Sequence, residues 1–387
     1  MRFAVFAAIA LLSLALAPKA EAASKDRKDS IRKARVWQRP AWINEDFSFD
    51  PSFDIKPGPA VSQKDAPLNK PHVACTMTEK TAKHDINGQT MKFFCDMEDG
   101  LGKVRDFKMK YKFSDGEISG EILGTRLLWA LGFPVDRMFL IDRLDCFGCT
   151  EDPFHDRRVD PTSLETPRTF ELAAAESKFP GKQITWMDDG EEQEGWDFKE
   201  FIRVLPKEAG KKLEQQTQRE AVRLLTVFLR HADTKPENQR LVCEGKVDDE
   251  GGCSGETVLM IQDLGLTFGF GIADDDHVSK VYWKDWDTSP VWKDPSKCQG
   301  LLGNNHTTEM MEPVIREQGR AFLARLLKGF SDGSEGRKRV EDLFRSGRAE
   351  LRQGTIEQWT NTFLRKVDEI AYPMGRDNAD FRCPQSF

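Results

Sequence analysis

The sequence predicts an α+β protein with a β-rich N-terminal part and a larger, mostly helical C-terminal part. Alternating apolar and polar residues over 91–113 predict a strand hairpin. Apolar residues spaced three and four apart predict helices over 117–132, over 213–229 and in the last 80 or so residues. A chain of 387 residues exceeds what one small hydrophobic core usually holds, which favours a two-lobed domain or two domains.

The first 22 residues are typical of a secretory signal peptide. A basic residue, Arg2, precedes an apolar run over 4–17 and a small-x-small sequence, Ala20-Glu21-Ala22. The run is too short to span a hydrocarbon core of about 30 Å, and no later segment approaches about 18 apolar residues, so we expect no transmembrane anchor. We therefore expect an exported protein, either periplasmic, secreted or in the lumen of the secretory pathway.

Composition restricts the partners. The formal net charge of −7 argues against nucleic acid as the principal partner. Residues 23–70 are rich in Lys, Asp, Pro and Ser with scattered aromatics, and we interpret them as an extended N-terminal arm on the body of the protein or as a disordered leader.

All eight cysteines follow the predicted signal peptide, and an even number in an exported chain predicts disulfides. Two pairs bracket plausible hairpins: Cys75 with Cys95, and Cys243 with Cys253. Cys146-Phe-Gly-Cys149 has the spacing of half a zinc site or of a redox motif. Because no second CxxC or His pair lies nearby, a disulfide is favoured there.

A polar octapeptide, His231-Ala-Asp-Thr-Lys-Pro-Glu-Asn238, follows the helix predicted over 213–229. Proline stops the helix and pushes the preceding residue toward extended geometry, so the polar side chains project from a loop. An ordinary polar turn, with Asp233 or Asn238 bonding local backbone, is the alternative.

A second motif, Asp263-Leu-Gly265, follows the apolar segment 258–262. The polar, Gly-rich segment 244–255 predicts a hairpin tip, which leaves 239–242 and 258–262 as paired strands. Such pairing would place Asn238 beside Asp263, as two ligands of one metal ion require.

Together these motifs resemble a protein-kinase site. The octapeptide resembles the kinase catalytic loop, and Asp263-Leu-Gly265 resembles the magnesium-binding triplet. The phrases that begin at Gly120 and at Asp263 look more like the atypical kinases, namely the secretory-pathway casein-kinase family and the HipA-type bacterial kinases. The resemblance covers roughly residues 91–271.

The resemblance implies a two-lobed kinase-like fold, with an N-lobe over 71–145 and the hinge, insertions and C-lobe over 146–387. It also implies ATP and Mg²⁺ or Mn²⁺ between the lobes. Asp233 would act as catalytic base and Lys235 would lie near the transferred phosphate. Asn238 and Asp263 would hold the metal.

A kinase also needs a strand lysine that reaches the phosphates and a helix glutamate that orients it. We assign Lys112 and Glu121 to these roles. Lys110 and Glu117 are the alternatives, because an error of one residue in register swaps the faces of a strand. An exposed salt bridge with no functional role is the competing interpretation.

We therefore expect an exported kinase-like phosphotransferase that moves the γ-phosphate of ATP to a hydroxyl of a protein, a sugar or another acceptor. ATP is scarce outside the cytoplasm, so a pseudokinase that binds nucleotide without transfer is the main alternative. A third interpretation is adenylyl transfer from the same site, with the nucleotide bound in the reversed orientation. Gly100-x-Gly102 is weak evidence for a phosphate-covering loop, and no Ala-Pro-Glu segment is present, so activation-loop control is not supported.

Overall fold

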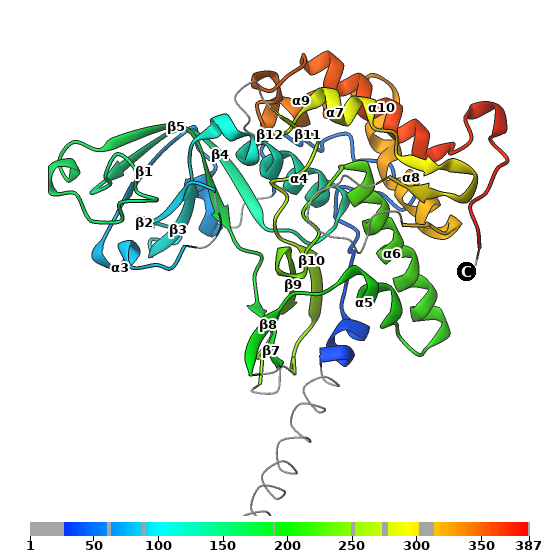
Figure 1. Cartoon of the computed structure of the whole chain (residues 1–387), viewed down its shortest axis with the longest axis horizontal. Helices are drawn as coiled ribbons and strands as arrows, with labels where there is room; N and C mark the ends of the chain where they lie inside the picture. The colour runs from blue at the N-terminus through cyan, green and yellow to red at the C-terminus, as the bar shows by residue number, and fades with distance from the viewer. Residues whose placement is uncertain are drawn as a thin grey trace, which may run out of the picture.

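Strands in the first half of the chain close into a barrel (Figure 1). The computed structural model describes residues 27–59, 63–86, 88, 90–188, 190–248, 252–272, 278–301 and 313–385, so the predicted signal peptide lies outside the described residues. In barrel order the strands are β1 (His72–Thr76), β2 (Lys92–Glu98), β3 (Val104–Lys110), β5 (Arg168–Ser177) and β4 (Arg137–Phe147). Phe107 and Met109 of β3 belong to the barrel core, so the alternating Lys108 and Lys110 lie on the opposite face of the strand.

The barrel continues beyond the boundary that we predicted at residue 145. Strand β4 runs through that position to Phe147 and pairs with β5 along most of its length, from Arg137 opposite Ser177 to Cys146 opposite Arg168. Because β5 also pairs with β3, the chain leaves the barrel after Ser177 and not at the Cys146–Cys149 turn.

Helix α4 (Glu117–Leu131) lies between the barrel and the remaining long helices (Figure 1). The barrel and the helical part have separate hydrophobic cores, and α4 contributes Leu123, Leu127 and Leu131 to the helical one. The helices predicted over 117–132 and 213–229 are confirmed, as is the mixed α and β content. Residues 27–33 are also helical, and further helices are α3 (Glu79–Ala82), α5 (Phe198–Arg203), α6 (Ala209–Phe228), α7 (Trp283–Thr288), α8 (Glu317–Ser331), α9 (Gly333–Ser346) and α10 (Ile356–Ala371).

Smaller sheets connect these elements. Strands β6 (Lys182–Gln183), β9 (Gln239–Cys243) and β10 (Thr257–Ile261) form one sheet, and β7 (Thr185–Asp188) pairs with β8 (Glu191–Glu194) in a hairpin. The remaining pairs are β11 (Phe270–Ile272) with β12 (Val278–Lys280), and β13 (Trp292–Asp294) with β14 (Gln299–Gly300).

The described part of the N-terminal arm packs on the helical part. Its residues Ile31, Ile43 and Ile55 are buried in the helical core. The indole nitrogens of Trp37 and Trp42 donate hydrogen bonds to carbonyl oxygens at the end of α4, at 2.7 Å and 2.9 Å. These contacts agree with an arm that lies on the body of the protein rather than with a disordered leader.

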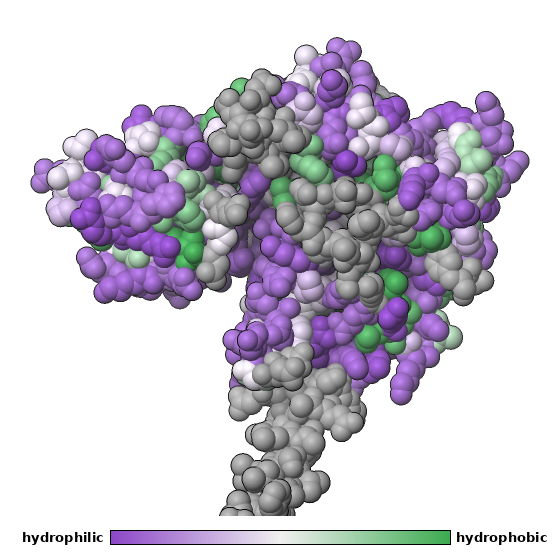
Figure 2. Space-filling view, in the orientation of Figure 1, coloured by the Kyte–Doolittle hydropathy of each residue, from purple (hydrophilic) through white to green (hydrophobic). Residues whose placement is uncertain are grey.

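Four disulfides link the eight cysteines: Cys75–Cys95, Cys146–Cys149, Cys243–Cys253 and Cys298–Cys383. The first three are the pairs that the sequence predicts. Within the described residues no helix combines the length and the apolar character needed to cross a membrane. The face shown in Figure 2 is largely hydrophilic, with hydrophobic residues in small separate groups.

Candidate functional site

The β9–β10 hairpin brings the two polar motifs together. The predicted pairing is confirmed, with Gln239 opposite Ile261 next to the motif residues. The backbone carbonyl of Asn238 accepts from the N–H groups of Gln262 and Asp263, at 2.9 Å and 3.4 Å. Two residues 25 positions apart in sequence therefore share one end of the hairpin.

The octapeptide forms a turn that orders its own polar groups. The side-chain amide of Asn238 donates to the Asp233 carbonyl at 3.2 Å, and Lys235 Nζ lies 3.6 Å from the Asp233 carboxylate. This is the local bonding that the polar-turn alternative predicts. It uses the amide nitrogen of Asn238, whereas a metal ion would bind the amide oxygen. His231 is buried, and burial lowers the pKa of its imidazole, so it adds no positive charge here.

Lys110, and not Lys112, lies against Glu121. Strand β3 ends at Lys110, and Lys112 follows as an exposed residue with a left-handed φ of 66°. Lys110 Nζ is ion-paired with Glu121 and lies 3.6 Å from Glu117. The assignment of Lys112 assumed that the strand alternation continued to residue 113, and the left-handed turn interrupts it.

Three carboxylates surround the Lys110 ammonium. One oxygen from each of Glu117, Glu121 and Asp263 lies within 4.8 Å of the others. Burial opposes the charge on Lys110, but these carboxylates outweigh burial and raise its pKa. Lys110 is therefore a fixed cation at the meeting point of β3, α4 and the segment after β10.

The two glutamates of α4 differ in their ionisation. Burial raises the pKa of Glu121 to about 8 despite its contact with Lys110. No hydrogen-bond donor among the described residues reaches its second oxygen, Oε2. Burial also disfavours ionised Glu117, but Lys110 and Lys280 together lower its pKa to about 2. Glu117 is thus a fixed anion, whereas Glu121 changes charge near neutral pH.

Two glycines let α4 approach the Asp263 segment. A Cβ on Gly120 would lie 2.6 Å from the carbonyl oxygen of Gly265, and a Cβ on Gly124 would lie 2.9 Å from Leu264 Cβ. Thr267 Oγ1 also donates to the Gly120 carbonyl at 3.2 Å. Sequence reasoning did not assign these glycines, although their spacing of four on a helix places them on one face.

A polar pocket of ≈ 370 Å³, here called the barrel pocket, is lined by residues of β3 that include Lys108. Lys108 is ion-paired with Glu176, and both line the pocket. Lys178 also lines it, and its Nζ lies 2.5 Å from the Glu176 carboxylate. The charged lining residues are Lys64, Arg105, Lys108, Arg137 and Lys178, with Asp65, Asp106 and Glu176.

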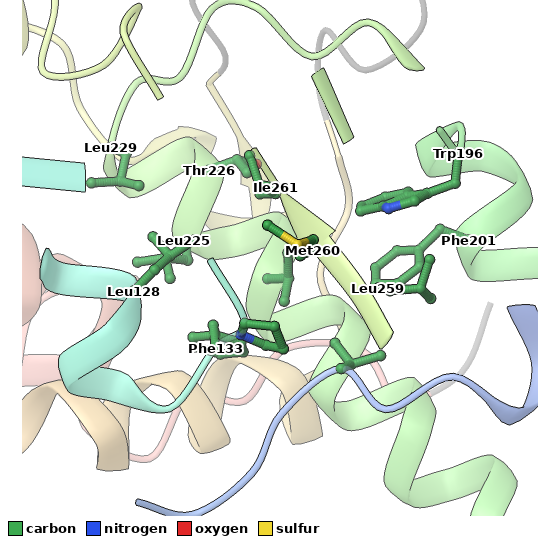
Figure 3. Close-up of a pocket in the computed structure, with 13 residues that line it drawn as sticks. Leu128, Phe133, Trp196, Phe201, Leu225, Thr226, Leu229, Leu259, Met260 and Ile261 are labelled. Atoms are coloured by element: carbon green, nitrogen blue, oxygen red, sulfur yellow. The ribbon is translucent and has the colours of Figure 1, made fainter. Parts of the chain in front are cut away.

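The gap drawn in Figure 3 is not a ligand site. Its lining is almost wholly apolar, with Thr226 as the polar exception, and comes from the arm, α4 and the segment after it, Trp196, α5, α6 and the residue after it, and β10. Its cavity volume of ≈ 10 Å³ is about the minimum for one water molecule, so we interpret it as a packing gap in the helical core.

No family model and no curated protein matches the sequence. Among solved structures, the crystal structure of CtkA, a proinflammatory kinase of Helicobacter pylori, is similar at 11% identity and a TM-score of 0.36. The alignment covers 77% of this chain and 92% of that chain. A likeness this weak carries no argument about function, which must come from the residues of this chain.

Proposed function

We propose that this chain is a kinase-like phosphotransferase that moves the γ-phosphate of ATP to a hydroxyl acceptor. The observation that carries the proposal is the meeting of Lys110, Glu121 and Asp263, which come from three separate segments of the chain. Phosphoryl transfer requires mainly positioning and charge stabilisation, and these residue types supply both.

The donor set fits a hard divalent cation. Carboxylate and amide oxygens are the ligands that Mg²⁺ prefers, and Asp263 and Asn238 offer them at one end of the β9–β10 hairpin. When bound, the ion would neutralise charge on the β- and γ-phosphates. Lys110, oriented by Glu121, would contact the phosphates from the side of the barrel.

The octapeptide would supply the catalytic base and a contact to the transferred phosphate. Asp233 is only partly buried, so its carboxylate is accessible to an acceptor hydroxyl and would take its proton. Lys235, which lies 3.6 Å from that carboxylate and is about half exposed, would contact the transferred phosphate.

The barrel pocket suits the rest of the nucleotide. Its ≈ 370 Å³ lies within the range of about 300–1,000 Å³ for small-molecule sites, and its lining carries an excess of cations. Lys108, which lines the pocket, lies on the same face of β3 as Lys110, because residues two apart on a strand share a face.

The four disulfides fit an oxidising compartment, which supports the proposed export.

Thermal unfolding with magnesium and ATP tests nucleotide binding. We expect Mg²⁺-ATP to raise the Tm of wild type and not that of Asp263→Ala. Incubation with γ-labelled or α-labelled ATP, comparing wild type with Asp233→Ala, then tests transfer. Transfer of the γ label by wild type alone supports the proposal, and transfer of the α label indicates adenylylation. A Tm shift with no transfer to any acceptor indicates a pseudokinase.

A further inference from the structure

A second pocket lies between the β7–β8 hairpin and the octapeptide, and we call it the hairpin pocket. Its volume is ≈ 530 Å³, and it shares no lining residue with the barrel pocket. Its wall includes Trp186 from β7 and Pro236 and Glu237 from the octapeptide. In Figure 1 the hairpin projects beside the ends of β9 and β10.

Close backbone packing fixes this pocket against the loop that carries the proposed base. Gly195, just after β8, has φ of +80°, and a Cβ there would lie 1.9 Å from the Pro236 carbonyl oxygen. The hairpin therefore rests directly on the loop, three residues after Asp233. A molecule held in the pocket therefore contacts the loop that carries Asp233, at a site whose lining is separate from that of the barrel pocket.

The pocket selects for positive charge. Among the described residues, the lining carries four carboxylates, those of Glu192, Glu194, Asp197 and Glu237, and one cation, Arg27. Opposite charge concentrated in a concave site attracts cationic ligands and raises their local concentration.

A cation of this chain already occupies one part of the pocket. The Arg27 guanidinium lies over the Trp186 ring at 3.8 Å from its centroid and is also ion-paired with Glu200. No hydrogen-bond acceptor among the described residues reaches Arg27 Nε, which is buried. The ring is thus already covered by an arginine of this chain, in the cation–π arrangement that stabilises guanidinium groups, which leaves the lining carboxylates to hold the cation of a ligand.

We propose that the hairpin pocket binds a basic segment of a polypeptide acceptor, with an arginine or lysine held by the lining carboxylates. This inference rests on the proposed function and names its acceptor class. A serine or threonine hydroxyl of the segment would lose its proton to Asp233 as its oxygen bonds to the γ-phosphorus. The bond from that phosphorus to the β–γ bridging oxygen would break, releasing ADP.

Peptide binding without nucleotide tests the pocket independently of transfer. The probes are a fluorescently labelled serine peptide with two arginines and the same peptide with both arginines replaced by alanine, followed by anisotropy. We expect wild type to bind the arginine peptide, and Glu192→Gln/Glu194→Gln to weaken binding at least tenfold. Glu192 and Glu194 are exposed, so their substitution leaves the fold intact. Glu45→Gln/Glu165→Gln, two exposed carboxylates elsewhere, is the charge-matched control and should bind as wild type does.

Equal affinity for the two peptides, or unchanged affinity in Glu192→Gln/Glu194→Gln, would overturn the proposal. Displacement of the peptide by an equal concentration of spermidine would overturn the polypeptide class in favour of small polyamines. The Mg²⁺-ATP shift in Tm is read separately. Arginine-dependent binding without that shift would contradict the proposed function and leave the pocket assignment standing. A shift in Tm without arginine-dependent binding would support nucleotide binding and contradict the pocket assignment.

Discussion

Gly120 of α4 and Gly265 after β10 are in direct backbone contact, since a Cβ on Gly120 would lie 2.6 Å from the Gly265 carbonyl oxygen. This contact sets the distance between the helix that carries Glu121 and the segment that carries Asp263. The proposed site therefore depends on a position where no side chain fits.

We expect Gly120→Ala to displace α4, destabilise the protein by about 1–3 kcal/mol and weaken Mg²⁺-ATP binding. Gly210→Ala is the matched control, because Gly210 lies in α6 with no neighbour within 4 Å of an added Cβ. That change should be neutral or stabilise by up to about 1 kcal/mol. Urea unfolding and the Mg²⁺-ATP shift in Tm measure both effects, and equal behaviour of the two variants would contradict the role of the contact.

Lys110→Met should abolish γ-phosphate transfer and lower the free energy of unfolding by about 3 kcal/mol, because it leaves buried carboxylates without their cation. Lys112→Gln should retain activity and change stability by less than about 0.5 kcal/mol, because Lys112 is exposed. Denaturant unfolding and the γ-label assay distinguish the two lysines. Loss of transfer in Lys112→Gln alone would restore the original assignment.

The ionisation of Glu121 predicts a pH dependence of stability. In the unfolded chain this carboxyl loses its proton near pH 4.5, whereas burial holds its pKa near 8 in the folded protein. The unfolded state therefore binds fewer protons between about pH 4.5 and 8, and the Glu121 contribution to stability falls as the pH rises through that window.

Glu121→Gln, which cannot ionise, should remove this contribution. As the pH rises through the window, the unfolding free energy of the variant minus that of wild type should increase by up to about 1.4 kcal/mol per pH unit. Urea titrations at pH 5, 6, 7 and 8 measure the difference. Parallel profiles for the two proteins would show that Glu121 keeps an ordinary pKa.

The disulfides should contribute unequally to stability. Cys298–Cys383 closes a separation of 85 residues and Cys243–Cys253 one of 10. Loop-closure entropy then predicts losses of roughly 4–5 and 2–3 kcal/mol when each pair is replaced by serine. Comparison of the two double variants by denaturant unfolding tests the order, and a larger loss for Cys243–Cys253 would contradict it.

Features that depend on neighbouring residues were predictable from the sequence. The 3.6-residue period located α4 and α6, and the hairpin closed by Cys243 and Cys253 predicted the β9–β10 pairing that joins Asn238 to Asp263. The catalytic and metal-binding roles of these residues stay predictions.

Only the tertiary structure decided which lysine faces Glu121, where the barrel ends and that Glu117 joins the charged cluster. A left-handed residue at position 112 ends the alternation of β3, and the strand period alone does not reveal such a turn. The hairpin pocket likewise arises where Gly195 packs on Pro236, which lies 41 residues later. Local periodicity depends on interactions along a few residues, whereas the position of a charged group in a site depends on packing between distant segments, and the sequence pattern does not encode that packing directly.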